Sequence, residues 1–295
     1  MSEICMQCPR RCAVDRTHRL GVCGVASGFR VARAARHDWE EPVISGTRGS
    51  GTIFFAGCNL RCVFCQNHAI SHLTHGRDLT DDALMSVMLR LQDEGVHNIN
   101  LVTPTHYAVR LASVLERVKP RLRIPVVYNS GGYESVATLR RLEGLVDVWL
   151  PDFKYYSADL SARYSAAADY CTVATAALEE MLRQAPTAVY DGEGMLVHGV
   201  IVRHLVLPGC RADSIRVLEW LAERFGPDAF LLSLMNQYTP EFAQNAPDRN
   251  LHRRVTTFEY QSVLDRARSL GFGGFLQDRA SATPAYTPDF MEQSL

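Results

Sequence analysis

Three cysteines stand close together directly after a short apolar run, TIFFAG, at residues 52–57. Cys58, Cys62 and Cys65 have the spacing C-x3-C-x2-C. Three thiolates on one tight loop can ligate three irons of a cubane cluster and leave the fourth iron without a protein ligand. A zinc knuckle is the alternative, and it would need a fourth ligand such as His68. A strand that leads straight into this spacing fits zinc poorly, so the loop predicts a [4Fe–4S] cluster with one open iron.

A second group of four cysteines lies near the beginning of the sequence: Cys5, Cys8, Cys12 and Cys23. In a reducing compartment, cysteines at such short spacings are more often metal ligands than disulfide partners. Four thiolates suit either a structural zinc or a fully ligated iron–sulfur cluster. The group therefore predicts a second metal site, and its spacing leaves zinc and iron both open.

From Gly51 onward, short apolar runs alternate with helical patterns, which is typical of βαβ units and a parallel sheet. The clearest helix is expected over Thr80–Glu94, with Thr80 as its N-cap and Gly95 after its end. Further helices are expected over 133–145, 211–225 and 256–270. Strands are expected over 52–56, 98–102, 125–128, 146–150, 200–207, 230–234 and 273–276.

This pattern predicts an α/β fold, a partial (β/α)6 TIM-like barrel with a small Cys-rich N-terminal lobe. We expect an irregular lobe with a metal site at residues 1–50, the barrel at 51–277 and a C-terminal strap at 278–295. In barrels of this kind the chemistry lies at the carboxyl ends of the strands. Lys154 and Arg203 fall at such ends, where an anionic carboxylate would offset their burial. The alternative for Asp152 and Lys154 is a structural ion pair that caps the barrel.

The cysteine loop resembles that of the radical S-adenosylmethionine (SAM) superfamily. From Gly51 to about Gln277, the chain is similar to relatives of pyruvate formate-lyase activating enzyme. The matching motifs follow successive strands: LVTPTHY at 101–107, YNSGGY at 128–133, LPDFKY at 150–155, VRHLVLPG at 202–209 and MNQY at 235–238. The resemblance implies that the open iron binds SAM. An electron from the cluster then cleaves SAM to a 5′-deoxyadenosyl radical, which abstracts hydrogen from a substrate.

The same resemblance implies a set of SAM-binding residues at the strand ends: Thr103, Thr105, Asn129, Ser130, Asp152, Lys154, Arg203 and Gln237. In this set Asn129 stands where the family has an aspartate, and Gln237 where it has a histidine near the ribose. Thr103 and Thr105 replace the glycine-rich turn that binds the SAM amino group. The activating enzymes also hold a monovalent cation beside the SAM carboxylate. No catalytic residue is assigned.

By this resemblance the protein is an activase that makes a glycyl radical on a partner protein and takes electrons from a flavodoxin or ferredoxin type of donor. One alternative is a radical SAM enzyme that acts on a small molecule or peptide. Another is a non-catalytic metal-binding scaffold, which would have no need of a SAM pocket. An incomplete barrel with a lateral opening favours a protein substrate.

The composition narrows the possible partners. The chain of 295 residues has a formal net charge of −1, so it lacks the excess of positive charge that is typical of nucleic-acid-binding proteins. No run approaches the roughly 20 apolar residues of a membrane helix. The first residues, MSEICMQCPRRC, lack the apolar stretch of a signal peptide. We therefore expect a cytoplasmic protein with neither nucleic-acid nor membrane partners.

Overall fold

The computed structural model describes residues 4–276 and Phe290. Its strands are β1 (Ile4–Cys5), β2 (Val14–Asp15), β3 (Phe29–His37), β4 (Ser50–Phe55), β5 (Arg77–Leu79), β6 (Ile99–Val102), β7 (Val126–Ser130), β8 (Val148–Pro151), β9 (Val189–Tyr190), β10 (Leu196–Leu205), β11 (Leu231–Met235) and β12 (Gly274–Leu276). Its α-helices are α1 (Pro42–Ser45), α2 (His68–Ser71), α3 (Asp81–Asp93), α4 (Ala108–Val118), α5 (Val136–Arg140), α6 (Ala158–Ser165), α7 (Tyr170–Gln184), α8 (Arg211–Phe225) and α9 (Thr257–Ser269). Four 3-10 turns complete the chain: η1 (Thr105–Tyr107), η2 (Lys119–Arg121), η3 (Pro240–Ala243) and η4 (Arg249–His252).

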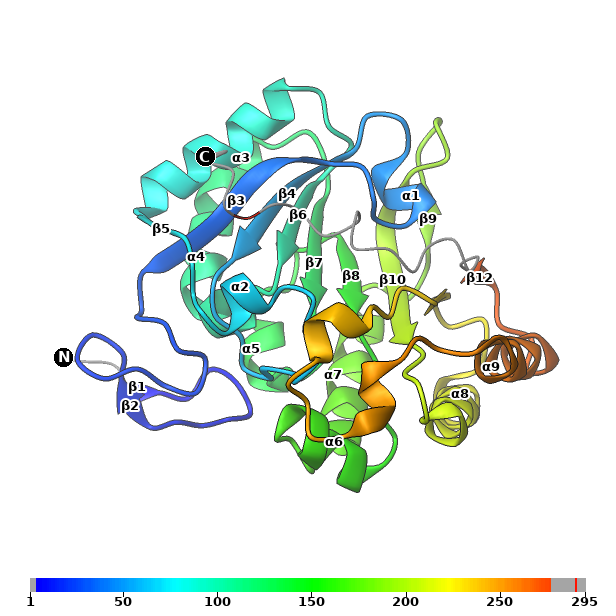
Figure 1. Cartoon of the computed structure of the whole chain (residues 1–295). Helices are drawn as coiled ribbons and strands as arrows, with labels where there is room; N and C mark the ends of the chain where they lie inside the picture. Colours follow the sequence, from blue (N-terminus) through cyan, green and yellow to red (C-terminus); the bar gives the residue numbers. More distant parts are fainter. Residues whose placement is uncertain (1–3, 277–289, 291–295) are drawn as a thin grey trace.

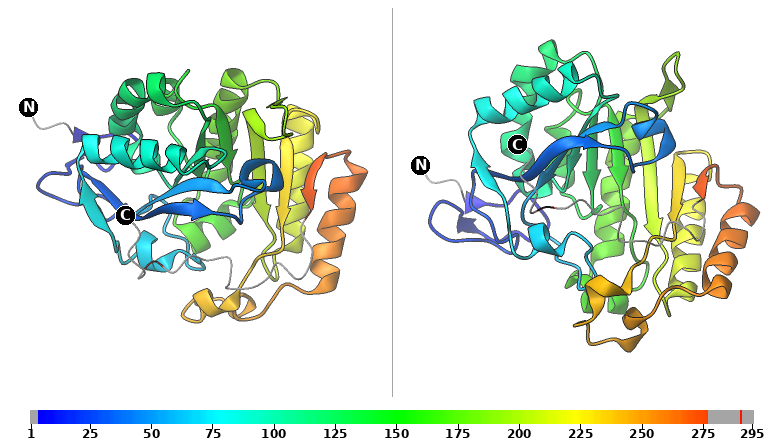
Figure 2. Two further views of the ribbon diagram at one scale, coloured as in Figure 1. Left: turned by 90° about the horizontal axis from the view of Figure 1, so that it is seen from above. Right: turned by 45° about the horizontal axis from the view of Figure 1, so that its top comes forward.

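One curved sheet forms the centre of the molecule, with strand order β12-β11-β10-β8-β7-β6-β4-β3-β5 and β9 added beside β10. Neighbours from β4 to β12 along this order run parallel. In the described part of the chain no pairing joins β5 to β12, so the sheet is not closed. The predicted α/β fold with an incomplete parallel barrel is confirmed. Figures 1 and 2 show the long helices on the outer face of the curve.

The parallel strands are buried on both faces because helices cover one side and the barrel interior lies on the other. All residues of β4, β6, β7 and β8 are buried. In helix α3, a local capping residue and the spacing of apolar residues together determine how the helix packs. The Thr80 side chain accepts a hydrogen bond from the Ala83 amide, and Leu84, Met88 and Leu91 are buried against the sheet. The helix predicted over Thr80–Glu94 is therefore confirmed to within one residue at each end.

The segment before Gly51 differs from the prediction. Residues 29–37 form β3, which pairs antiparallel with β4 and with β5. The expectation of an irregular lobe over residues 1–50 is wrong for this stretch, because alternate residues of β3 are apolar and fit a sheet. The predicted domain boundary at residue 50 would separate β3 from β4, which are paired in one continuous sheet. Only the stretch before β3, with its short β1–β2 pair, lies outside the main sheet.

Two other expectations need adjustment. The helix expected over Tyr133–Leu145 is shortened to α5, because Gly132 has a φ of +76° and the residues after Arg140 form turns. The predicted C-terminal strap, residues 278–295, lies outside the described residues except for Phe290. The ring of Phe290 packs against Phe54, with centroids 5.3 Å apart.

Candidate active site at the carboxyl ends of the strands

The cysteine loop begins where β4 ends. Gly57 allows the chain to leave the strand with a φ of +84°. Each sulfur of the loop then receives one hydrogen bond from a different donor. Cys58 Sγ accepts from the Leu60 amide at 3.4 Å, and Cys65 Sγ from the Ser71 hydroxyl at 3.3 Å. These two contacts hold Cys58 to the loop itself and Cys65 to α2.

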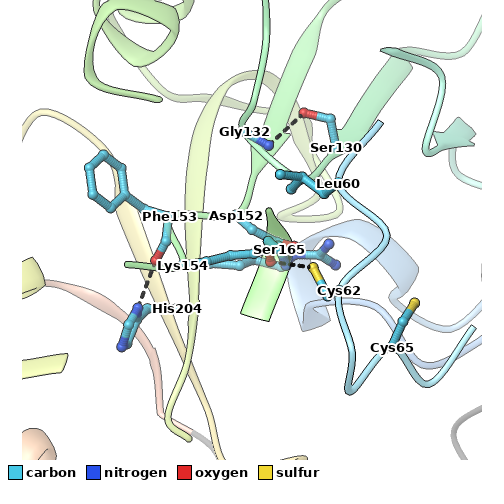
Figure 3. Close-up of polar contacts among 12 residues, drawn as sticks. Leu60, Cys62, Cys65, Ser130, Gly132, Asp152, Phe153, Lys154, Ser165 and His204 are labelled. Carbon is cyan, nitrogen blue, oxygen red and sulfur yellow. Dashed lines mark hydrogen bonds and ion pairs between the residues drawn. The ribbon is translucent and has the colours of Figure 1, made fainter. Parts of the chain in front are cut away.

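The third sulfur is held by α6. Ser165 Oγ lies 2.9 Å from Cys62 Sγ and 2.8 Å from the Tyr155 hydroxyl. Figure 3 shows this contact with Asp152 and Lys154 close by. Cys62, Ser165 and Tyr155 are all buried. Hydrogen bonds to sulfur and exclusion of water are two of the means by which a protein sets the potential of an iron–sulfur cluster.

The surroundings of the three cysteines suit ligands of a cluster better than free, reactive thiols. Burial, followed by the neighbouring Cys62 thiol, raises the pKa of Cys65 to about 12. A thiol in this setting stays protonated and unreactive unless a metal displaces its proton. Within the described residues, no three Cys, His, Asp or Glu side chains are already arranged so that they could hold a single metal ion. The fit therefore rests on the three sulfurs, their spacing and their hydrogen bonds: Cys58, Cys62 and Cys65 would hold the cluster.

Beside the loop, an ion network joins the ends of the central strands. Arg203 of β10 forms three contacts with its guanidinium group. Its Nε donates to Asp152 Oδ1 at 2.9 Å, and its Nη2 donates to Asn129 Oδ1 at 2.6 Å. Its Nη1 donates to Glu40 Oε2 at 3.3 Å. The rigid guanidinium fork thus fixes the ends of β7, β8 and β10 relative to one another.

Lys154 completes this network. Its Nζ lies 2.5 Å from Asp152 Oδ2, so this carboxylate contacts two cations. Burial alone would lower the pKa of Lys154, but Asp152 and the nearby Cys62 outweigh it and raise the pKa above its usual value. Burial alone would likewise raise the pKa of Asp152, and Arg203 and Lys154 reverse the shift. All three groups are therefore charged at neutral pH.

A cleft of about 140 Å³ opens over this network. Of the predicted SAM-binding residues, Asn129, Arg203 and Gln237 line it, together with the exposed ring of Trp39. Two acceptors in its wall, Glu41 Oε2 and Asn67 Oδ1, are buried without a hydrogen-bond partner among the described residues. Buried acceptors of this kind favour a ligand with N–H or O–H donors. SAM carries such donors in its amino, ribose and adenine groups, so the acceptors of the cleft wall match its chemistry.

The remaining predicted SAM-binding residues lie at the same strand ends but make internal contacts. Thr103 has a φ of +58°, and its amide donates to Asn129 O at 2.8 Å. Thr105 donates to Glu134 Oε1 at 2.5 Å. Ser130 Oγ accepts from the Gly132 amide at 3.3 Å, as Figure 3 shows. These three residues do not line the cleft over the ion network.

Sequence reasoning missed two acidic residues of the site. Glu40 lies in the loop between β3 and α1 and accepts from Asn100, Asn129 and Arg203. Glu134 is buried beside Thr105, its partners among the described residues are the neutral Thr105 and Tyr128 hydroxyls, and burial raises its pKa to about 7. A signal for Glu40 was present, because two acidic residues follow the tryptophan in DWEEP at 38–42. No spacing in the sequence links them to the strand ends.

The comparisons agree with this geometry. The model of the radical SAM superfamily matches residues 52–168, which contain the cysteine loop and the first four parallel strands. An uncharacterized protein of Methanocaldococcus jannaschii is 30% identical over 275 residues, which are 89% of this chain and 74% of that protein. This chain belongs to the radical SAM superfamily. Membership implies a [4Fe–4S] cluster and SAM, and it supports an enzyme that uses both.

Radical SAM membership leaves the branch of the family open. The crystal structure of methylornithine synthase aligns with a TM-score of 0.47 and 16% identity over 72% of this chain. This chain spans 59% of that one. No helix among the described residues has the length and apolar character needed to cross a membrane.

Proposed function

We propose that this radical SAM enzyme abstracts hydrogen from a carbon of a polypeptide, as an activase that makes a glycyl radical on a partner protein. With its cluster and SAM bound, such an enzyme supplies a 5′-deoxyadenosyl radical. That radical would take the hydrogen of a substrate C–H bond onto its 5′ carbon and leave the unpaired electron on the substrate carbon. The residues of this chain bind SAM, position it and exclude water.

The observation that supports a bulky substrate is the open sheet with an aromatic residue at the cleft. In the part of the chain that the structure describes, β5 and β12 do not pair, so these residues do not form a complete barrel around the strand ends. Trp39 lines the cleft, and 56% of its surface is exposed. Exposed aromatic side chains next to a cavity are typical contact residues for another polypeptide. A small-molecule enzyme has less need of such a residue in contact with solvent.

Within the site, the charges favour a defined orientation of SAM. Arg203 and Lys154 are cations that can attract the methionyl carboxylate, and Arg203 lines the cleft. Glu40, Glu41 and Asn129 offer acceptors to amino and hydroxyl groups on the same wall. A non-catalytic scaffold would have no need of this arrangement of donors and acceptors.

The test uses the anaerobic enzyme with SAM, a strong reductant and cell lysate separated by size. We expect 5′-deoxyadenosine to increase with the macromolecular fraction, and a glycyl-radical doublet to appear in the EPR spectrum of that fraction. Trp39→Ala should reduce this increase. Phe258→Ala removes an exposed aromatic ring on α9, outside the cleft, and should leave it unchanged. An increase only with the small-molecule fraction would refute the activase and favour a self-contained enzyme.

A further inference from the structure

The N-terminal cysteines lie against the cysteine loop of the active site. Arg10, between Cys8 and Cys12, donates its Nε to Asn59 O at 2.7 Å and its Nη2 to Ser165 O at 2.8 Å. Asn59 directly follows Cys58, and Ser165 is the residue that contacts Cys62. Arg10 therefore connects the N-terminal segment both to the cysteine loop, at Asn59, and to α6, at Ser165. Figure 1 shows this segment at the edge of the sheet where the parallel strands end.

The closest link joins a cysteine of each group. The Cys58 amide donates to Cys23 O at 3.3 Å. A Cβ atom at Gly57 would lie only 2.7 Å from the same carbonyl, so this approach requires glycine at position 57. The two backbones are thus in direct contact. A short path of covalent bonds and one hydrogen bond connects the Cys23 thiol to the Cys58 thiol.

The four N-terminal cysteines all fall between residues 5 and 23 of the sequence. Cys8 and Cys23 are buried, while Cys5 and Cys12 are partly exposed. Cys12 Sγ accepts from the Val22 amide at 3.4 Å, which brings the third cysteine next to the fourth. Three closely spaced cysteines with a distant fourth are typical of iron–sulfur ligation, whereas zinc ligands more often come in two close pairs.

The surface around these cysteines carries both apolar and basic side chains. Ile4, Met6 and Leu20 are each more than half exposed, and Arg11 and Arg19 are exposed on the same stretch. Transient electron-transfer partners bind through small interfaces. Exposed apolar and basic side chains beside a redox group give such a partner a place to dock.

We propose that Cys5, Cys8, Cys12 and Cys23 hold a fully ligated [4Fe–4S] cluster, and that the Cys23 carbonyl and the Cys58 amide form its electron path to the active site. A one-electron protein reductant of the flavodoxin or ferredoxin class reduces the N-terminal cluster from the 2+ to the 1+ state. That electron moves to the cluster at Cys58, Cys62 and Cys65, and the N-terminal cluster returns to the 2+ state. This inference depends on the radical SAM cluster and is independent of the substrate.

The first experiment identifies the metal. In the Cys58/Cys62/Cys65→Ala variant, purified without oxygen, we expect about four irons and four sulfides per chain. Adding Cys12→Ala should remove them. Zinc, or no metal, in the first variant would overturn the proposal. If that variant does not fold, the wild-type protein decides: about eight irons per chain support two clusters, and about four refute the second.

The second experiment tests the path. In the reduced wild-type protein, two nearby paramagnetic clusters should give an EPR spectrum that differs from the sum of the single-cluster spectra. Stopped-flow reduction by reduced flavodoxin should lose its fast phase in Cys12→Ala, while reduction by titanium(III) citrate should keep its rate. Cys171→Ala removes a thiol outside both groups and should behave as wild type. Additive EPR spectra, or an unchanged fast phase in Cys12→Ala, would refute the relay even if SAM cleavage and substrate activation proceed as proposed.

Discussion

Arg203 donates to Asp152 across 2.9 Å, and the two residues also form a parallel bridge that extends the pairing of β8 and β10. Lys154 occupies the second carboxylate oxygen of Asp152. The contact between Arg203 and Asp152 therefore both joins two strands and balances buried charges. It extends the sheet at the point where the cleft begins, and it sets the charge of the cleft wall.

We expect Asp152→Asn to weaken SAM binding and to destabilise the fold by about 3–5 kcal/mol, because it leaves two buried cations without a full counter-charge. Iron content should stay at the wild-type value, since Asp152 lies outside the cysteine loop. Urea denaturation, equilibrium dialysis with SAM and iron analysis measure the three effects. Asp82→Asn, in an exposed pair with Arg117, should cost less than about 1 kcal/mol. Unchanged SAM affinity in folded Asp152→Asn would favour a purely structural pair.

Ser165→Ala should make the potential of the active-site cluster more negative. The hydroxyl contacts Cys62 Sγ, and a hydrogen bond to sulfur stabilises the more negatively charged, reduced state. A net contribution of about 1 kcal/mol corresponds to about 40 mV for a one-electron couple. An EPR-monitored redox titration measures the shift. Ser161→Ala, whose hydroxyl donates within α6 to Ala158 O, is the matched control and should leave the potential unchanged.

Stability should fall between pH 5 and pH 8 because of Glu134. Burial raises its pKa from 4.5 to about 7, so its contribution to stability is complete below pH 4.5 and is lost as the pH rises through 7. The loss amounts to about 3 kcal/mol. Glu134→Gln should remove this pH dependence while keeping an acceptor for Thr105. Urea midpoints of both proteins across this range measure it, with Glu116→Gln on the surface as control. Parallel curves for wild type and Glu134→Gln would contradict the assignment.

The Cys58/Cys62/Cys65→Ala variant should yield no 5′-deoxyadenosine above background with SAM and a strong reductant. The three sulfurs are the proposed ligands of the cluster, and the other thiols cannot supply its open iron. Quantification of 5′-deoxyadenosine by mass spectrometry provides the measurement. Cleavage at the wild-type rate would refute the assignment of these ligands.

Local patterns in the sequence predicted the cysteine loop, the parallel strands and the capped helices, because each depends on residues close together in the chain. The helix α3, with its cap at Thr80, is an example. Glu40 could not be found in this way. It contacts Arg203, which is 163 residues away, and nothing in the local motif DWEEP links it to the strand ends. Ser165 was missed for the same reason, since only tertiary packing brings α6 to Cys62.

The position of β3 determines how this protein can be divided. Removing residues 1–49 would turn β4, whose six residues are all buried, into an open edge with unpaired amide and carbonyl groups. Such edges pair with other chains and aggregate. A chimera that exchanges the N-terminal cysteines with those of a relative must therefore be joined before Phe29, so that β3 stays with its own barrel. The cysteine segment can be exchanged only if its contacts with Asn59 and Ser165 are kept, whereas the strand that follows it must stay.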